Sequence, residues 1–387
     1  MTTIDSQGTP RFHGLDGLRA VAVTLVLSHH FLTSALATEL VRHHLTTLAA
    51  FLSTLTRSGV ELFFVLSAVV LLRPYLRGER KMALLRFYSR RVQRLWPPYL
   101  AALFLAGLVI WFNTVVPTWY SREVWFRFSP RDWGRQILMF NFGWPTYNVA
   151  WWSLTIELLF YVVAPLLVLW LTRVGVGRRR YTLLVVAALL VGLMVNFSGP
   201  VPEPGGDRLT TLRLALTYAP CFAIGCAIAA RDFDADTGAT LVAVGAAVLF
   251  VTIVQPVFNV HAAYALVYGG AVILAMSPTT PLRLLETFPL VWLGERSYSL
   301  FLTHFSALYA ADNVAALFFP ARVTSYFLLS RALGLVLALF ATLLVFCLVE
   351  RRFAKNLATA KVLFPWQSSV SSLVRRDKPR NRAESGA

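Results

Sequence analysis

The sequence predicts an all-α fold, a polytopic bundle of about ten transmembrane helices with both termini in the cytoplasm. Of its 387 residues, 57% are hydrophobic and 14% are charged, whereas soluble chains carry about a quarter charged residues. The mean hydropathy is +0.61. Apolar runs of about 20 residues recur, the length that crosses a hydrocarbon core of about 30 Å. These observations favour an integral membrane protein.

The spans follow from the apolar runs, taken in chain order. Residues 1–14 are polar and no small-residue cleavage site follows the first run, so we expect a retained helix and no cleaved signal peptide. The expected spans are 15–34, 53–73, 95–116, 152–172, 181–199, 209–230, 238–255, 261–277, 287–309 and 324–349. The stretch 117–151 is too polar to span, and its aromatic side chains suit a loop at the membrane interface.

The orientation follows from the basic residues. Segment 73–94 holds eight lysines and arginines, segment 173–180 holds four, and the tail after Glu350 holds nine. Ten spans place all three segments on the side of the N-terminus, which the positive-inside rule makes cytoplasmic. The net charge of +17 is then mainly a topology signal with anionic lipid headgroups as partner, and we expect no nucleic-acid binding. The four arginines of 117–151 are an exception to this pattern.

Three parts are therefore expected: a polar N-terminal segment over 1–14, a transmembrane domain over 15–350, and a basic, disordered cytoplasmic tail over 351–387. The three cysteines fall inside apolar runs without metal-ligand spacing, so we predict neither a metal site nor disulfide bonds.

The first span carries charged side chains in a helical pattern. At 100° per residue, eleven positions bring Arg19 and His30 within 20° of one face, about 16 Å apart along the axis, while His29 points about 80° away. Asp16 lies one turn before Arg19 and can pair with it. An arginine inside a span costs about 2.5–3.5 kcal/mol on insertion scales. Arg19 therefore either faces a functional cavity or extends to the headgroups.

Other polar residues inside the spans form two layers. The layer of acids and bases towards the outer side contains His30, Glu61, Glu157 and His304. The layer of fixed positive charge towards the inner side contains Arg19, Arg91, Arg94 and Arg296. Each residue alone is equally compatible with a structural interhelical hydrogen bond. Four titratable groups at one depth favour a functional site.

Five motifs in order resemble acyltransferase family 3, the bacterial membrane O-acyltransferases. "LDGLRAVAVTLVLSHH" is similar to the opening motif, with its arginine and histidine on Arg19 and His30. "GVELFFVLSA" resembles the second-helix motif, with Ala68 in place of a glycine. "FYSRRVQRLWPPYL" matches the Arg-x-x-Arg element. "WWSLTIELLFY" matches the motif whose glutamate falls on Glu157, with Leu158 replacing a second acid. "LGERSYSLFLTH" and "LVERRF" resemble the late motifs, so the likeness covers about 13–355.

The resemblance implies an enzyme that moves an acyl group, usually acetyl, from cytoplasmic acyl-CoA (acetyl-CoA) to a hydroxyl of a carbohydrate or glycosylated product, without a bound cofactor. Clustered arginines suit the CoA phosphates. This role falls on Arg90, Arg91 and Arg94, whose charges would serve topology equally well. His30 is then the general base, with Glu157 orienting it, or the carrier of the acyl group. Arg19 would hold the donor or polarise its thioester.

Asp16, Glu61, Arg296 and His304 are the expected supporting residues. The chain resembles a stand-alone member, without the esterase-like domain that some relatives append, and we expect it in the plasma membrane. Acceptors left open are a surface polysaccharide, a lipid-linked glycan and a glycosylated macrolide-type metabolite. Two other classes compete, a secondary transporter and a non-catalytic scaffold. The sequence lacks the inverted repeats common in transporters, and its polar layers disfavour a scaffold.

Overall fold

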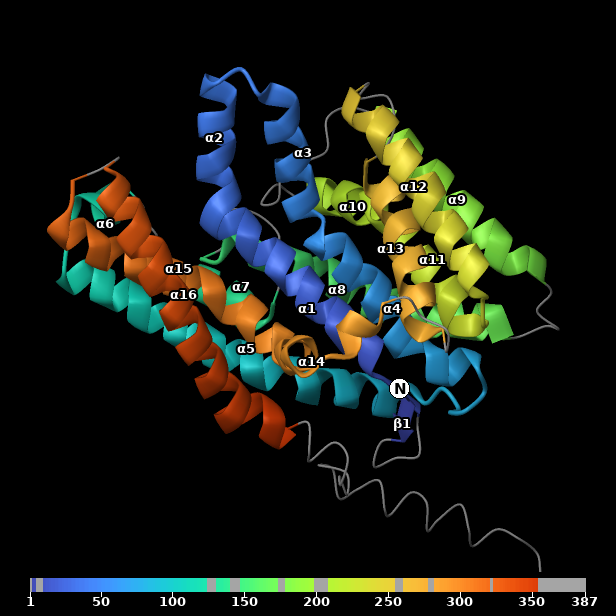
Figure 1. The fold of residues 1–387 in the computed structure, drawn as a ribbon. Coiled ribbons are helices and arrows are strands. Elements are labelled where there is room, and N and C mark those ends of the chain that lie inside the picture. The colour runs from blue at the N-terminus through green and yellow to red at the C-terminus, as the bar shows by residue number, and fades with distance from the viewer. Residues whose placement is uncertain are drawn as a thin grey trace, which may run out of the picture.

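The computed structural model describes residues 2–4, 10–123, 130–139, 147–172, 178–197, 208–254, 260–277, 282–320 and 323–353. A short antiparallel hairpin pairs β1 (Thr2–Ile4) with β2 (Pro10–Phe12). All other regular elements in these ranges are helices (Figure 1). The predicted all-α class is confirmed. Of the expected tail over 351–387, residues 351–353 are helical and residues 354–387 lie outside the described residues.

The first expected span is longer than hydropathy indicated. It comprises α1 (His13–Ser28), a π-helical turn η1 (His29–Thr33) and α2 (Ser34–Arg42) in direct succession. No glycine or proline follows Arg19 within it, so nothing in the backbone ends the helix where the apolar run ends. The chain turns at His44, whose φ is 61°. It then folds back as α3 (Thr46–Arg57) and enters α4 (Gly59–Leu76).

The third span also begins earlier than expected. Helix α5 (Leu84–Val115) contains the arginine motif within its first turns, whereas the sequence placed the motif before the helix. The described residues of 117–151 (117–123, 130–139 and 147–151) form the short helices α6 (Trp119–Glu123), α7 (Pro130–Ile137) and η2 (Val149–Trp151), none of them long enough to span. Helix α8 (Trp152–Thr172) then follows the expected fourth span.

The remaining expected spans each overlap a helix. These elements are α9 (Arg178–Phe197), α10 (Arg208–Thr217), α11 (Ala219–Ala230), α12 (Ala235–Val254), α13 (Val260–Met276), η3 (Arg283–Glu286), α14 (Phe288–Glu295), α15 (Ser297–Phe318), α16 (Thr324–Val345) and a second π-helical turn, η4 (Phe346–Glu350).

Six of the described helical stretches are long and apolar enough to cross a membrane, and a seventh if α10 and α11, bent by 42°, count as one span. The polytopic class therefore holds, while the number ten stays a prediction. Two further expected spans contain shorter apolar helices, Tyr181–Gly192 within α9 and Val260–Met276, and the expected span 287–309 is divided between α14 and α15 at Arg296.

Helices α5, α15 and α16 lie on one side of the bundle and α9, α11, α12 and α13 on the other, with α1, α4 and α8 between them (Figure 1). Helix α14 packs directly on α1. A Cβ atom at Gly294 would overlap the carbonyl oxygen of Asp16, and one at Gly17 would overlap that of Leu285. Glycine at these positions permits the close approach that holds Arg19 beside the start of α15.

Candidate functional site

A polar pocket of about 130 Å³ lies where α1, α4, α5, α8, α15 and the π-turn η4 meet. Its polar lining is Arg19, Ser67, Arg91, Arg94, Ser153, Glu157, Tyr161, Glu295, Ser297, Tyr298 and Glu350. Its apolar lining includes Val60, Phe63, Leu154 and Phe301. Four of the sequence-predicted residues, Arg19, Arg91, Arg94 and Glu157, therefore share one cavity. We call it the arginine pocket.

Helices α4 and α8 supply a hydrogen-bonded centre to this pocket. Ser67 donates a hydrogen bond of 2.8 Å to Oε1 of Glu157, and the Tyr161 hydroxyl donates to the same oxygen. Glu157 and Tyr161 are four residues apart, so both side chains lie on the same face of α8. A carboxylate inside a helix bundle is costly without hydrogen-bond partners. The two hydroxyl donors supply these partners to Glu157.

The helical phase of α5 turns two of its three neighbouring arginines towards the pocket. Arg91 and Arg94 line the pocket, whereas Arg90, about 100° away from Arg91 around the helix, does not. The Nε atom of Arg91 is buried and has no hydrogen-bond partner. Its guanidinium lies within electrostatic reach of Glu157 and Tyr161. Arg91 therefore brings an unsatisfied donor to the pocket, which an anionic ligand would satisfy.

Helix α1 and the C-terminal π-turn close the same end of the pocket. Arg19 forms the predicted ion pair with Asp16, with 2.8 Å between Nη1 and Oδ1. Glu350 accepts a hydrogen bond of 2.5 Å from Ser299. Among the described residues, π-turns occur at 29–33 and 346–350, and these carry His30 and Glu350. Such turns often mark functional sites, because the extra residue re-aims the side chains.

His30 lies in a separate group next to the pocket. Its ring stacks on His304 with centroids 5.4 Å apart, and Phe305 approaches edge-on at 4.7 Å. His29 turns instead towards α3, where it contacts Thr56 at 3.2 Å. The two histidines thus diverge as the helical phase predicts. Arg19 lines the arginine pocket together with Gly294 and Glu295, and His30 contacts His304 and Phe305 of α15.

The tautomer of His304 follows from its contacts. Nδ1 lies 2.8 Å from the carbonyl oxygen of Phe301, and since a carbonyl only accepts, Nδ1 carries the hydrogen. Nε2 is then an acceptor, and it is buried without a partner. Phe301 joins this group to the pocket, because it lines the pocket and its ring lies 5.9 Å from His304.

Glu61 and Arg296, both expected as supporting residues, lie outside the pocket lining. Glu61 is paired with His261 of α13 at 2.6 Å, which ties α4 to α13. The Arg296 guanidinium stacks over the rings of Trp292 and Phe346 at 4.3 Å and 4.5 Å. These contacts suit packing roles.

The predicted outer layer of acids and bases therefore divides into three groups: Glu157 with the arginines, His30 with His304, and Glu61 with His261. The hydrogen bonds described for Glu157 go to Ser67 and Tyr161, so the structure does not show the expected pairing of Glu157 with His30.

Sequence reasoning missed several lining residues. Ser67 and Glu350 both lie inside the quoted motifs, which was the available signal. Tyr161 and Tyr298 also lie inside quoted motifs, but aromatic residues in apolar runs are ordinarily core, so neither was singled out. His261 was hidden at the start of an apolar run. In the described part of the chain, no group of three or more His, Cys, Asp or Glu side chains could hold a metal ion.

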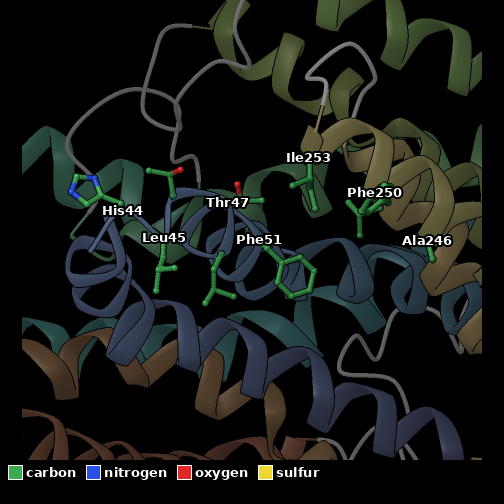
Figure 2. A pocket seen from close by; sticks show the side chains of 10 residues that line it. His44, Leu45, Thr47, Phe51, Ala246, Phe250 and Ile253 are labelled. Carbon is green, nitrogen blue, oxygen red and sulfur yellow. The ribbon is translucent and has the colours of Figure 1, made fainter. Parts of the chain in front are cut away.

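A larger cavity of about 700 Å³ lies elsewhere, between α3 and α12 (Figure 2). Leu45, Leu48, Phe51, Phe250 and Ile253 form most of its wall. It contains none of the candidate residues and offers no charged side chain. Its size alone therefore does not make it the reaction site.

The comparisons agree with the motif resemblance. A model of the acyltransferase domain family matches residues 12–351. The chain is 25% identical to the Bacillus subtilis protein YrhL, provisionally named a peptidoglycan O-acetyltransferase, over 78% of this chain and 49% of that one. It is 27% identical to the O-acetyltransferase OatA of Staphylococcus aureus, over 78% and 51% respectively. It is also 27% identical to the acyltransferase MdmB of Streptomyces mycarofaciens, over 77% and 79%.

The chain spans about half the length of the first two relatives. No solved structure matches it.

Proposed function

This chain belongs to the acyltransferase family whose domain it matches, and from that premise we propose that it transfers an acetyl group from acetyl-CoA to a hydroxyl of a carbohydrate or glycosylated acceptor. The proposal places the protein in the plasma membrane. The O-acetyltransferase names of two relatives support the acyl group and the hydroxyl acceptor.

One observation carries the proposal: Arg19, Arg91 and Arg94 line a single pocket, and Phe301 of the same lining contacts His304, on which His30 stacks. Coenzyme A is a polyanion whose phosphates suit arginine, through bidentate and charge-assisted hydrogen bonds. Arg91 lines the pocket and its buried Nε has no hydrogen-bond partner, so the described protein contacts alone do not satisfy this guanidinium. A neutral imidazole beyond the pocket suits proton transfer from a hydroxyl.

The chemistry assigned to these residues is a single acyl transfer. The acceptor oxygen attacks the thioester carbonyl carbon, its proton passes to the His30 imidazole, and the carbon–sulfur bond breaks. The imidazolium then protonates the leaving thiolate. Arg19 lies on the same face of the first helix as His30, at the end that lines the pocket. From there it stabilises negative charge on the donor.

A covalent route uses the same histidine. His30 attacks the thioester carbonyl carbon, the carbon–sulfur bond breaks, and the leaving thiolate takes the imidazole proton. The acceptor hydroxyl then attacks the acyl-imidazole, the carbon–nitrogen bond breaks, and the hydroxyl proton returns to the ring. Mass spectrometry of acid-quenched protein, incubated with acetyl-CoA and no acceptor, separates the two routes. An acetyl adduct on His30 identifies the covalent route, and its absence during turnover identifies direct transfer.

Glu157 is assigned a supporting role in the pocket. Its carboxylate is held by Ser67 and Tyr161 and lies within electrostatic reach of Arg91. It therefore orients the guanidinium for the donor phosphates. This assignment replaces the expectation that Glu157 orients His30.

The test is transfer of labelled acetyl from acetyl-CoA by the full chain in proteoliposomes. The acceptor panel contains a peptidoglycan fragment, a lipid-linked glycan and a glycosylated macrolide. We expect label in one acceptor class, and the Arg91→Gln variant should need more acetyl-CoA to reach the same rate. Absence of label from every acceptor, with folded protein, contradicts the proposal. Uptake of an intact solute without acyl transfer would favour the transporter class.

A further inference from the structure

We infer that Phe63 and Phe301 form the end wall of the arginine pocket and set the length of the acyl group that this enzyme transfers. The inference rests on the proposed function and deepens it, since it names which acyl donors the site accepts. It concerns specificity alone, because neither ring carries a group that reacts.

The pocket has a polar end and an apolar end along α4. Ser67, hydrogen-bonded to Glu157, lies at its centre. Phe63 comes four residues before Ser67, about 6 Å along the helix, and Val60 comes one turn earlier still. Helix α8 shows the same order, with Tyr161 near the arginines and Leu154 towards the phenylalanines. The charged side chains of the lining therefore lie towards the Tyr161 end, together with Val70, Leu71 and Leu95, whereas the phenylalanine end is lined by hydrocarbon side chains and Ser153.

The two rings meet across the apolar end. Their centroids lie 6.0 Å apart with an interplanar angle of 70°, the edge-to-face geometry that aromatic pairs favour. Phe301 is buried, with 5% of its surface exposed, and Phe63 is half-buried. Behind Phe301, one helical turn further along α15, lies His304, on which His30 stacks. The phenylalanine pair thus separates the arginine pocket from the two histidines.

This position determines which acyl chains fit. A donor whose phosphates lie at the arginines must extend its thioester past Ser67 towards His30. The carbonyl-bound chain then lies against the two rings. A methyl group requires little space there, whereas each further methylene must displace an aromatic ring. A single methylene in a fitted apolar pocket changes kcat/KM by about 10- to 200-fold.

The experiment compares acetyl-, butyryl- and hexanoyl-CoA as donors for the full chain in proteoliposomes, with the acceptor found above. The wild type should prefer acetyl-CoA. Phe63→Ala and Phe301→Ala should raise the butyryl-to-acetyl ratio of kcat/KM by at least about tenfold. Phe63→Leu and Phe301→Leu keep more of the core volume and should shift the ratio in the same direction. These leucine variants test the inference if the alanine variants do not fold.

A matched control removes a buried ring outside the pocket. Phe222 is 7% exposed and stacks on Phe160 at 4.2 Å. Its ring also lies 4.8 Å from Phe64, which lines the pocket, so Phe222→Ala creates a comparable cavity that leaves both wall rings, Phe63 and Phe301, in place. It should keep the wild-type donor ratio.

Unchanged donor ratios in all four wall variants, a wild type that uses hexanoyl-CoA as well as acetyl-CoA, or an equal shift in Phe222→Ala would overturn the inference. The proposed function fails separately, when the wild type transfers no acyl group from any of the three donors.

Discussion

The Arg91→Gln substitution should weaken the use of acyl-CoA far more than any other charge removal on α5. Arg91 lines the arginine pocket, its Nε is buried without a partner, and Glu157 lies within electrostatic reach. A hydrogen bond to a charged group contributes about 1.5–3 kcal/mol. At about 1.4 kcal/mol per tenfold change, losing one such bond corresponds to a rise of about 10- to 150-fold in the KM for acetyl-CoA.

The two neighbouring arginines refine this prediction. Arg94 lines the pocket but is exposed, so its interaction is screened by solvent and is worth about 0–1 kcal/mol. Arg94→Gln should therefore raise KM by less than about fivefold. Arg90, adjacent to the Arg-x-x-Arg motif and expected from the sequence to bind the donor as well, lies off the pocket lining, and Arg90→Gln should leave KM near the wild-type value.

Initial rates against acetyl-CoA concentration in membranes check these values, with kcat expected to change little, because the contact is made to a part of the donor that does not react. Arg86→Gln, an exposed position on the same helix, is the charge-matched control. An unchanged KM in Arg91→Gln, or an equal rise in Arg86→Gln, would refute the assignment and leave these arginines as topology signals.

Three further predictions follow from other parts of the structure. His30→Ala should abolish acyl transfer, whereas His29→Ala should reduce it less, because His29 faces Thr56 on α3. An inactive His29→Ala together with an active His30→Ala would reverse the assignment. Gly294→Ala should lower the thermal midpoint in detergent, because the added Cβ would overlap the backbone of Asp16. The control Gly134→Ala, where a Cβ has open space, should not lower it. Equal midpoints in the two variants would exclude close packing as the reason for glycine at position 294. Hydrogen bonds from Arg77, and to a lesser degree Arg73, hold the pKa of Asp232 below its usual value. The ionised carboxylate therefore stabilises the fold above about pH 4, and this stabilisation is lost as the pH falls through the lowered pKa. Asp232→Asn should therefore reduce the fall of the thermal midpoint at acidic pH. An unchanged fall in this variant would show that the ion pairs of Asp232 with Arg77 and Arg73 contribute nothing to stability.

Local helical geometry accounts for the site residues that could be predicted. The phase of α1 separated His30 from His29, and the spacing of three placed Asp16 beside Arg19. The second follows from 100° per residue within α1, whereas His29 and His30 lie in the π-turn η1, where the rotation per residue is smaller but successive side chains still point in different directions. The same rule explains why Arg91 enters the pocket and Arg90 does not.

Interhelical partners could not be predicted in this way. Whether Glu157 meets His30 or Ser67 depends on how α4 and α8 are rotated about their axes, and only packing determines that rotation. Hydropathy also misplaced two helix ends, at Arg42 and Leu84. It reports where a helix leaves an apolar environment, while the backbone continues in a helix until a breaker or a turn stops it.

The central claim, that the thioester of the donor lies in the arginine pocket, is tested most directly by bromoacetyl-CoA, which alkylates a thiol within reach of its acyl group. The probe variant is Ser67→Cys, at the pocket centre, and the control is Ser89→Cys on α5, outside the lining. After incubation of proteoliposomes, mass spectrometry locates the adduct. We predict alkylation at position 67 that acetyl-CoA suppresses and that Arg91→Gln reduces, with no such protection at position 89. Absence of alkylation at position 67, or alkylation there that acetyl-CoA does not suppress, would contradict the claim.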